Sequence, residues 1–74
     1  MSDIVEFPAV GGVYVHYKGG RYEVITLCTH TETDEVLVIY KSLLFGTVYA
    51  RPLENWNTEV VVDSRKCKRF SRKS

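Results

Sequence analysis

Hydrophobic and polar residues alternate with a period of two along much of this chain, which is typical of β-strands that bury one face. The alternation is clearest in the first hairpin, and together with later apolar segments between turn residues it predicts five strands, over residues 13–18, 21–30, 36–41, 47–51 and 59–63. The third of these segments is dense in β-branched residues, which favour strands. No segment of useful length carries apolar residues at helical spacing, so we expect an all-β fold.

The first two predicted strands are joined by a pair of glycines at positions 19–20. A two-residue glycine loop is a preferred hairpin turn because both positions need a positive φ. With this loop, Tyr17 lies opposite Tyr22 and His16 lies opposite Glu23.

The C-terminal third of the chain predicts a turn, a last strand and a tail. Pro52 has no amide hydrogen for a ladder and ends the fourth strand. Residues 53–56 are too few for a regular helix and predict a 3-10 turn. The expected fold is a small SH3-like five-stranded barrel with a short 3-10 turn before the last strand. We expect a single domain over residues 1–74, with a folded body at about 11–64 and a basic tail at 65–74 that trails out.

The net charge of +1 conceals an uneven distribution of charge along the chain. Residues 1–64 hold four basic and nine acidic side chains, whereas residues 65–74 hold six basic side chains and no acid. An acidic body with a basic tail is a pattern of proteins that contact an anionic partner. The alternative is that the tail lies back on the acidic body or only keeps the protein soluble.

The sequence predicts a cytoplasmic protein with no membrane contact. Its N-terminal segment carries acidic residues and lacks the basic start and apolar segment of a secretory signal. The longest strongly apolar run, residues 36–40, is too short to cross a bilayer. Without a signal for export, Cys28 and Cys67 are expected to be reduced thiols.

The predicted hairpin tip is a candidate anion site. Lys18 and Arg21 flank the two glycines, whose amides can form a concave site for a group such as phosphate. The alternative is an exposed turn whose cations only increase solubility.

Aromatic residues are a second candidate for binding, because the chain holds five tyrosines together with Trp56 and Phe45. Exposed rings stack on the bases of single-stranded nucleic acid, but small barrels also need aromatic rings to fill the core. The predicted register places Tyr14 and Tyr17 on opposite faces of the hairpin, so some tyrosines are expected on the surface.

Catalytic and metal chemistry has weaker support. His16 and Glu23 can form a proton-transfer pair, but no nucleophile is linked to them by spacing and a structural role is favoured. Cys28 and His30 share a strand face, whereas His16 lies on the other face in the predicted register. The spacing to Cys67 matches no zinc pattern. We therefore expect no cofactor and no metal.

Arg51 and Pro52 end the fourth strand close to Glu54. We expect Arg51 to pin the following turn through a carboxylate or a carbonyl, because a strand ended by proline leaves backbone groups to satisfy. The alternative is that Arg51 projects as a recognition cation.

Several motifs resemble those of a bacterial and phage family known as domain of unknown function 1653. The resemblance extends from Gly11 to Phe70 and is carried by Gly12-x-Tyr14-x-His16-Tyr17-Lys18-Gly19, His30-x-Glu32-Thr33, Val38-x-Tyr40 and Arg51-Pro52. It implies a small SH3-like barrel and no assigned activity, so it carries over no functional residue. Members usually have an aromatic residue and a valine ahead of the Arg-Pro pair, where this chain has Tyr49 and Ala50. They also tend to stop near the Arg-Phe pair, whereas residues 71–74 extend this chain.

We expect a non-enzymatic binding module that engages an anionic partner, either nucleic acid or a nucleotide, through basic and aromatic residues. One alternative is an adaptor or phage-type inhibitor that docks another protein, and another is a metal-dependent or acid/base enzyme. The oligomeric state is left open. The candidate binding residues are Tyr14, His16, Lys18, Arg21, Tyr22, Tyr40, Arg51, Trp56, Lys66, Lys68 and Arg69.

Overall fold

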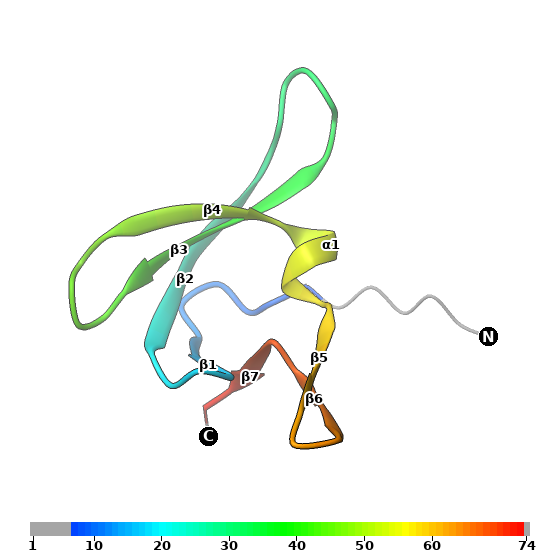
Figure 1. The fold of residues 1–74 in the computed structure, drawn as a ribbon. Coiled ribbons are helices and arrows are strands. Elements are labelled where there is room, and N and C mark those ends of the chain that lie inside the picture. Colours follow the sequence, from blue (N-terminus) through cyan, green and yellow to red (C-terminus); the bar gives the residue numbers. More distant parts are fainter. Residues whose placement is uncertain (1–6, 74) are drawn as a thin grey trace.

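The computed structural model describes residues 7–73, and within this range it consists of strands joined by turns (Figure 1). The elements in chain order are β1 (Val13–His16), β2 (Arg21–Thr29), β3 (Val36–Ser42), β4 (Val48–Pro52), α1 (Leu53–Trp56), β5 (Glu59–Val62), β6 (Arg65–Lys68) and β7 (Phe70–Arg72). The predicted all-β fold is confirmed. The turn before β5 is α-helical instead of 3-10, because the amide of Asn57 donates to the carbonyl of Leu53 at 3.1 Å.

The strands form two antiparallel sheets. Five strands lie in one sheet in the order β4-β3-β2-β1-β7, and β5 pairs with β6 in a second sheet. Seven strands in the described range replace the predicted five, and the SH3-like barrel stays a prediction. No helix within residues 7–73 has the length and apolar character needed to span a membrane.

The C-terminal segment is part of the fold, so the prediction of a tail that trails out from residue 65 is wrong. Asp63 and Ser64 have positive φ angles of 51° and 65°, the conformation of a two-residue hairpin turn, and they join β5 to β6. β7 then returns beside β1, where Phe70 pairs with His16. These strands are not evident from the sequence, because most of their side chains are polar or basic and show little apolar alternation.

β1 and β2 pair in a different register from the predicted one. Tyr14 lies opposite Tyr22, whereas the prediction placed Tyr17 opposite Tyr22. The pairing is therefore shifted by three residues. The loop holds three residues, since the His16 amide donates to the Gly20 carbonyl at 2.9 Å and the Gly19 amide donates to the His16 carbonyl at 2.7 Å. Gly19 has a φ of 110°, as in hairpins whose type I turn is followed by a bulge. Because the shift is odd, the side chains of β1 change faces relative to β2.

The observed register gathers aromatic side chains in the core. The buried hydrophobic residues are Tyr14, Val24, Val38, Tyr40, Leu53, Trp56 and Phe70. The rings of Trp56 and Phe70 stack with their centroids 3.8 Å apart, and Tyr14 and Tyr40 contact Trp56 edge-on. Tyr14, Tyr40 and Trp56 therefore fill the core and offer no open ring face for stacking on bases. Tyr49, by contrast, is 42% exposed.

Candidate functional site

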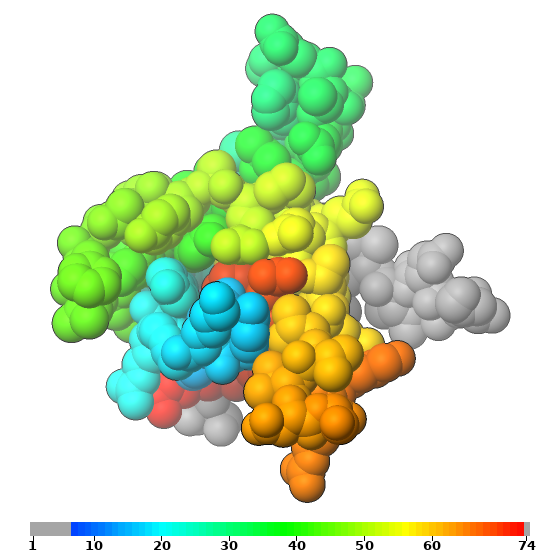
Figure 2. Space-filling model, viewed as in Figure 1, coloured from blue at the N-terminus to red at the C-terminus, as the bar shows by residue number. Residues whose placement is uncertain are grey.

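Three cations from distant parts of the sequence form what we call the basic face, namely Lys18, Arg51 and Arg69. They come from the β1–β2 loop, the end of β4 and the turn between β6 and β7. In Figure 2 these segments, coloured light blue, yellow-green and orange-red, meet on the side that faces the viewer. The Lys18 Nζ and the Arg69 guanidinium carbon lie 5.8 and 5.9 Å from the centre of the Tyr17 ring.

Arg69 is held in place by its backbone and its side chain. Its carbonyl accepts a hydrogen bond from the amide of Tyr17 at 2.9 Å, and its amide donates to the carbonyl of Thr58 at 3.1 Å. The guanidinium Nε donates to Thr58 Oγ1 at 2.8 Å. These bonds fix the guanidinium between the β1–β2 loop and the segment before β5.

Arg51 pins the turn that follows β4, as expected. Its Nε donates to the Tyr40 hydroxyl at 3.0 Å, and its NH1 group donates to Asn55 Oδ1 in α1. The turn is thus held through an amide carbonyl of Asn55. The guanidinium carbon also lies 5.4 Å from the centre of the Phe70 ring, which places a fixed positive charge over the core.

His16 lies among the three cations of the basic face. Its ring contacts those of Tyr17 and Phe70, at centroid distances of 4.6 and 4.9 Å. Its Nδ1 accepts a hydrogen bond from the Lys18 amide at 3.1 Å, so the neutral ring carries its hydrogen on Nε2. Burial lowers the pKa of His16 from 6.5, and the charges of Arg51, Arg69 and Lys18 lower it further.

The predicted pairing of His16 with Glu23 is wrong, because the register of the hairpin differs. Glu23 lies opposite Val13, and its Oε1 lies 4.0 Å from the Nζ of Lys41 on β3. His16 therefore has cations and aromatic rings for neighbours where a carboxylate was expected. The proton-transfer pair does not exist in this fold.

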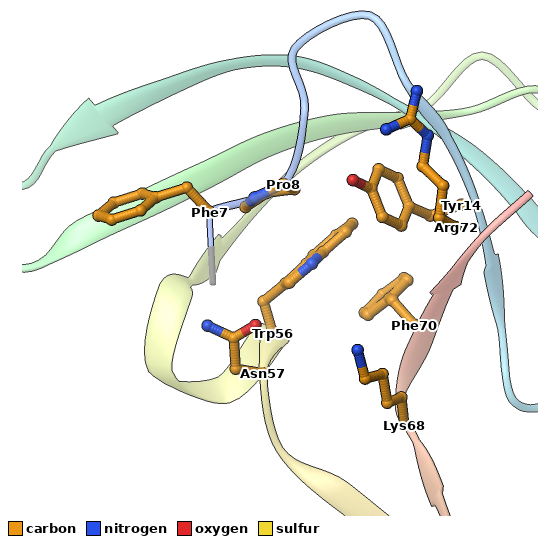
Figure 3. Close-up of a pocket in the computed structure, with 8 residues that line it drawn as sticks. All are labelled: Phe7, Pro8, Tyr14, Trp56, Asn57, Lys68, Phe70 and Arg72. Atoms are coloured by element: carbon orange, nitrogen blue, oxygen red, sulfur yellow. The ribbon is translucent and has the colours of Figure 1, made fainter. Parts of the chain in front are cut away.

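A pocket of about 430 Å³, which we call the Trp56 pocket, adjoins the core (Figure 3). It is lined by Phe7, Pro8, Tyr14, Trp56, Asn57, Lys68, Phe70 and Arg72. Figure 3 shows Arg72 and Lys68 at opposite ends of the aromatic rings. Phe70 links the pocket to the basic face, since its ring contacts both His16 and the Arg51 guanidinium.

Arg72 lies against a glycine just before β1. Its guanidinium carbon lies 5.7 Å from the centre of the Tyr14 ring. A Cβ at Gly12 would lie 3.2 Å from that carbon and 3.0 Å from the carbonyl oxygen of Ala9. Glycine at position 12 therefore leaves room for Arg72. Sequence reasoning missed Arg72 because it assigned this segment to a tail, although the Phe70-x-Arg72 spacing puts both residues on one face of a strand.

Of the remaining candidate residues, only Tyr22 adjoins these sites, since its ring contacts those of His16 and Phe70. Arg21 is exposed on β2 opposite Val15, so Arg21 and Lys18 do not flank a two-glycine turn. Tyr22 is half-buried against Tyr40 and Tyr49. Lys66 is exposed on β6.

The side chains that suggested metal binding do not converge. Within residues 7–73 no group of three His, Cys, Asp or Glu residues is arranged to hold a metal ion. Cys28 and Cys67 are free thiols. His30 lies at the start of the β2–β3 turn, where its Nδ1 accepts a hydrogen bond from the Glu32 amide at 3.1 Å.

Comparisons with known proteins agree with the resemblance in the motifs. The family model described as protein of unknown function DUF1653 matches residues 12–72. A crystal structure of a DUF1653 protein from Bordetella bronchiseptica is similar, with 36% sequence identity, a TM-score of 0.77, and coverage of 89% of this chain and 86% of that chain. No curated protein matches the chain. The chain belongs to the DUF1653 family.

Proposed function

We propose that this protein is a non-enzymatic binding module that engages an anionic partner, nucleic acid or a nucleotide, through the basic face. In this proposal an SH3-like barrel carries the face. The observation that supports it most is the gathering of Lys18, Arg51 and Arg69 around aromatic rings. Cations fixed over rings suit a backbone of phosphates, which supplies most of the affinity in such complexes.

The distribution of acidic residues supports the same proposal. Residues 32–35, which include three acids, lie in the β2–β3 turn, and Figure 1 shows this turn projecting away from β1 and β7. These three acids are thus kept away from the basic face, which favours a positive potential there. The lowered pKa of His16 reflects that potential in part.

Binding of labelled single- and double-stranded oligonucleotides at several salt concentrations tests the proposal. We expect the association constant to fall as the salt concentration rises. A plot of its logarithm against the logarithm of the salt concentration should have a slope of about −0.7 per phosphate contact for single strands. The variant Lys18→Ala/Arg69→Gln should weaken binding and flatten the slope. Binding that does not respond to salt would contradict the proposal.

A matched control separates the basic face from total charge. Arg65 and Lys66 are exposed on β6, and the variant Arg65→Gln/Lys66→Ala removes the same two charges. We expect it to bind nearly as tightly as the wild type. An equal loss in both double variants would show that charge alone, and not the basic face, drives binding.

A second candidate function is docking of another protein, which the β3–β4 loop favours. Leu44 and Phe45 are 81% and 77% exposed, and Leu43 beside them is also exposed. Consecutive apolar side chains at a hairpin tip suit insertion into an apolar recess of a partner. A partner captured from nuclease-treated lysate by the wild type, and lost with Leu44→Ser/Phe45→Ser, would support docking. Capture by both proteins would contradict it.

A further inference from the structure

The β3–β4 hairpin presents an exposed surface without charge. Residues 42–50 hold no acidic or basic side chain, although 26% of the residues in the chain are charged. All of them except Ser42 are exposed, and Figure 2 shows this green segment standing out from the body on the left. An exposed apolar segment of this kind is typical of a surface that contacts another molecule.

β4 is also an open edge of the five-stranded sheet. It pairs with β3 on one side, and no backbone hydrogen bond within residues 7–73 joins its other side to another segment. The Ser42 amide donates to the Thr47 carbonyl at 2.9 Å. Since hydrogen-bonded pairs alternate along an antiparallel ladder, Tyr49 bonds to β3. The amides and carbonyls of Val48 and Ala50 therefore point away from the sheet.

The proline at the end of β4 agrees with this direction of the backbone groups. Pro52 lies two residues after Ala50, so the side on which it lacks an amide hydrogen is the open side, where prolines of sheets are found. It also limits the open edge to the residues before it. The charged side chains that commonly protect an edge from pairing are absent from residues 47–50.

A second copy of the same strand is complementary to this edge. Antiparallel pairing about a two-fold axis places Val48 opposite the partner's Ala50, so that both residues with outward amides and carbonyls form hydrogen bonds. Tyr49 then lies opposite the partner's Tyr49, at a position where side chains on neighbouring strands are closest. Because the segment carries no charge, the symmetry brings no like charges together.

The apolar surface of the hairpin is large enough for such a contact. Its exposed large side chains are Leu43, Leu44, Phe45, Val48 and Tyr49, which expose between 42% and 81% of their surface. At ~150–200 Å² for a large side chain, they offer roughly 500 Å² per copy. Two copies can therefore remove roughly 1,000 Å² from water, which reaches the size of a specific interface.

We infer that two copies of the chain associate through β4 and form a two-fold dimer with one continuous antiparallel sheet. The hairpin tip of each copy extends past the partner's Pro52. The inference goes beyond the proposed function, because residues 47–50 are not part of the basic face. It assigns to a second copy the surface that the second candidate function assigns to another protein.

Sedimentation equilibrium of the full chain over a range of concentrations measures the association, and we expect a reversible dimer. Val48→Lys places an ammonium group of each copy near the two-fold axis, so it should weaken the association more than about tenfold. Val61→Lys is the matched control. Val61 is 69% exposed on β5, in the other sheet, and its substitution should leave the association unchanged. Circular dichroism checks that both variants fold.

A cross-link tests the register of the two strands. Opposite residues at a position without hydrogen bonds have Cα atoms about 4.5 Å apart, within the range that a disulfide spans. Tyr49→Cys in a Cys28→Ser/Cys67→Ser background should therefore form a covalent dimer under mild oxidation. Val61→Cys in the same background should stay mostly monomeric.

Each outcome supports or overturns the inference. A wild type that sediments as a monomer at every concentration would overturn it, and capture of another protein through Val48 by that monomer would return the surface to docking. A dimer that persists in Val48→Lys would overturn the assignment to β4. A dimer that is lost in Val48→Lys without a cross-link at position 49 would overturn the antiparallel register. Oligonucleotide binding by the basic face is measured separately, so failure of the dimer leaves the proposed function in place.

Discussion

Arg51, Arg69 and Arg72 each lie over an aromatic ring, at 5.4 Å from Phe70, 5.9 Å from Tyr17 and 5.7 Å from Tyr14. Such contacts, together with the hydrogen bonds of Arg51 and Arg69, restrict the rotamers of side chains that are otherwise mobile. A guanidinium that is already ordered loses less entropy when it binds an anion. At the scale of residues, the candidate sites are thus built from preorganised arginines.

His16 makes stability depend on pH. Its pKa lies below the ordinary value of 6.5 because of burial first, and of Arg51, Arg69 and Lys18 next. The folded state therefore prefers the neutral ring, so this contribution to stability is fully present above about pH 6.5 and is lost as pH falls toward the lowered pKa. We expect the midpoint of denaturant unfolding to fall from neutral pH to about pH 5.

Two variants check this prediction. His16→Gln removes the titrating group and should flatten the dependence on pH in this window. Arg69→Gln removes one positive neighbour and should raise the pKa of His16, as followed by NMR of the imidazole. A His16→Gln protein with the pH dependence of the wild type would contradict the account.

Gly12→Ala tests whether the close approach of Arg72 matters. The added methyl group would lie 3.2 Å from the guanidinium carbon and 3.0 Å from the Ala9 carbonyl oxygen. Such overpacking costs about 1–3 kcal/mol. We expect lower stability in denaturant unfolding and a displaced Arg72, although no charge is removed. An unchanged unfolding midpoint would show that the side chain of Arg72 moves aside freely.

β7 is the element that completes both candidate sites. It pairs with β1, places Phe70 in the core and Arg72 at the pocket, and follows directly on Arg69. The strand is short and mostly exposed, so a single buried side chain anchors it. The binding surfaces of the molecule therefore depend on how firmly Phe70 packs.

Phe70→Ala should destabilise the protein by about 3–5 kcal/mol, as expected for a large side chain removed from a core. Such a loss is comparable to the whole stability of a small domain. Circular dichroism and denaturant unfolding measure it. Ser71→Ala on the same strand, at an exposed position, is the control and should change stability little. A folded Phe70→Ala protein with normal stability would contradict the role of β7 as an anchor.

Most strands and one functional detail followed from the sequence. Alternation in the first hairpin, β-branched residues in β3 and the proline at the end of β4 located most of β1 to β5. The role of Arg51 followed from the need of a proline-ended strand for satisfied polar groups. The register of the first hairpin did not follow, because two adjacent glycines fit more than one loop, and only Gly19 takes a positive φ.

The candidate sites were harder to predict than the strands. Tyr14 and Trp56 were candidate binding residues, but they are buried in the core, where they also line the pocket. Arg72 was missed because β7 lacks a visible apolar pattern. The grouping of Lys18, Arg51 and Arg69 depends on pairings between distant strands, which single-sequence patterns do not encode.

At the scale of the whole molecule, the fold determines where the charged segments lie in space. The sequence separates an acidic body from a basic C-terminal segment, but β6 and β7 return that segment to the body. Arg69 and Arg72 thereby join Lys18 and Arg51 beside the aromatic core, while the acidic β2–β3 turn projects away (Figure 1). Clustered cations produce a stronger local potential than scattered cations do, which speeds the association of anions.

The pKa of His16, measured by NMR with and without a saturating oligonucleotide, tests the central claim most directly, since the imidazole lies among the cations of the basic face. Phosphates bound there would offset the charges that lower this pKa. The account predicts that the pKa rises when the oligonucleotide binds and returns as salt releases it. An oligonucleotide that binds while the pKa of His16 stays unchanged would contradict binding at the basic face.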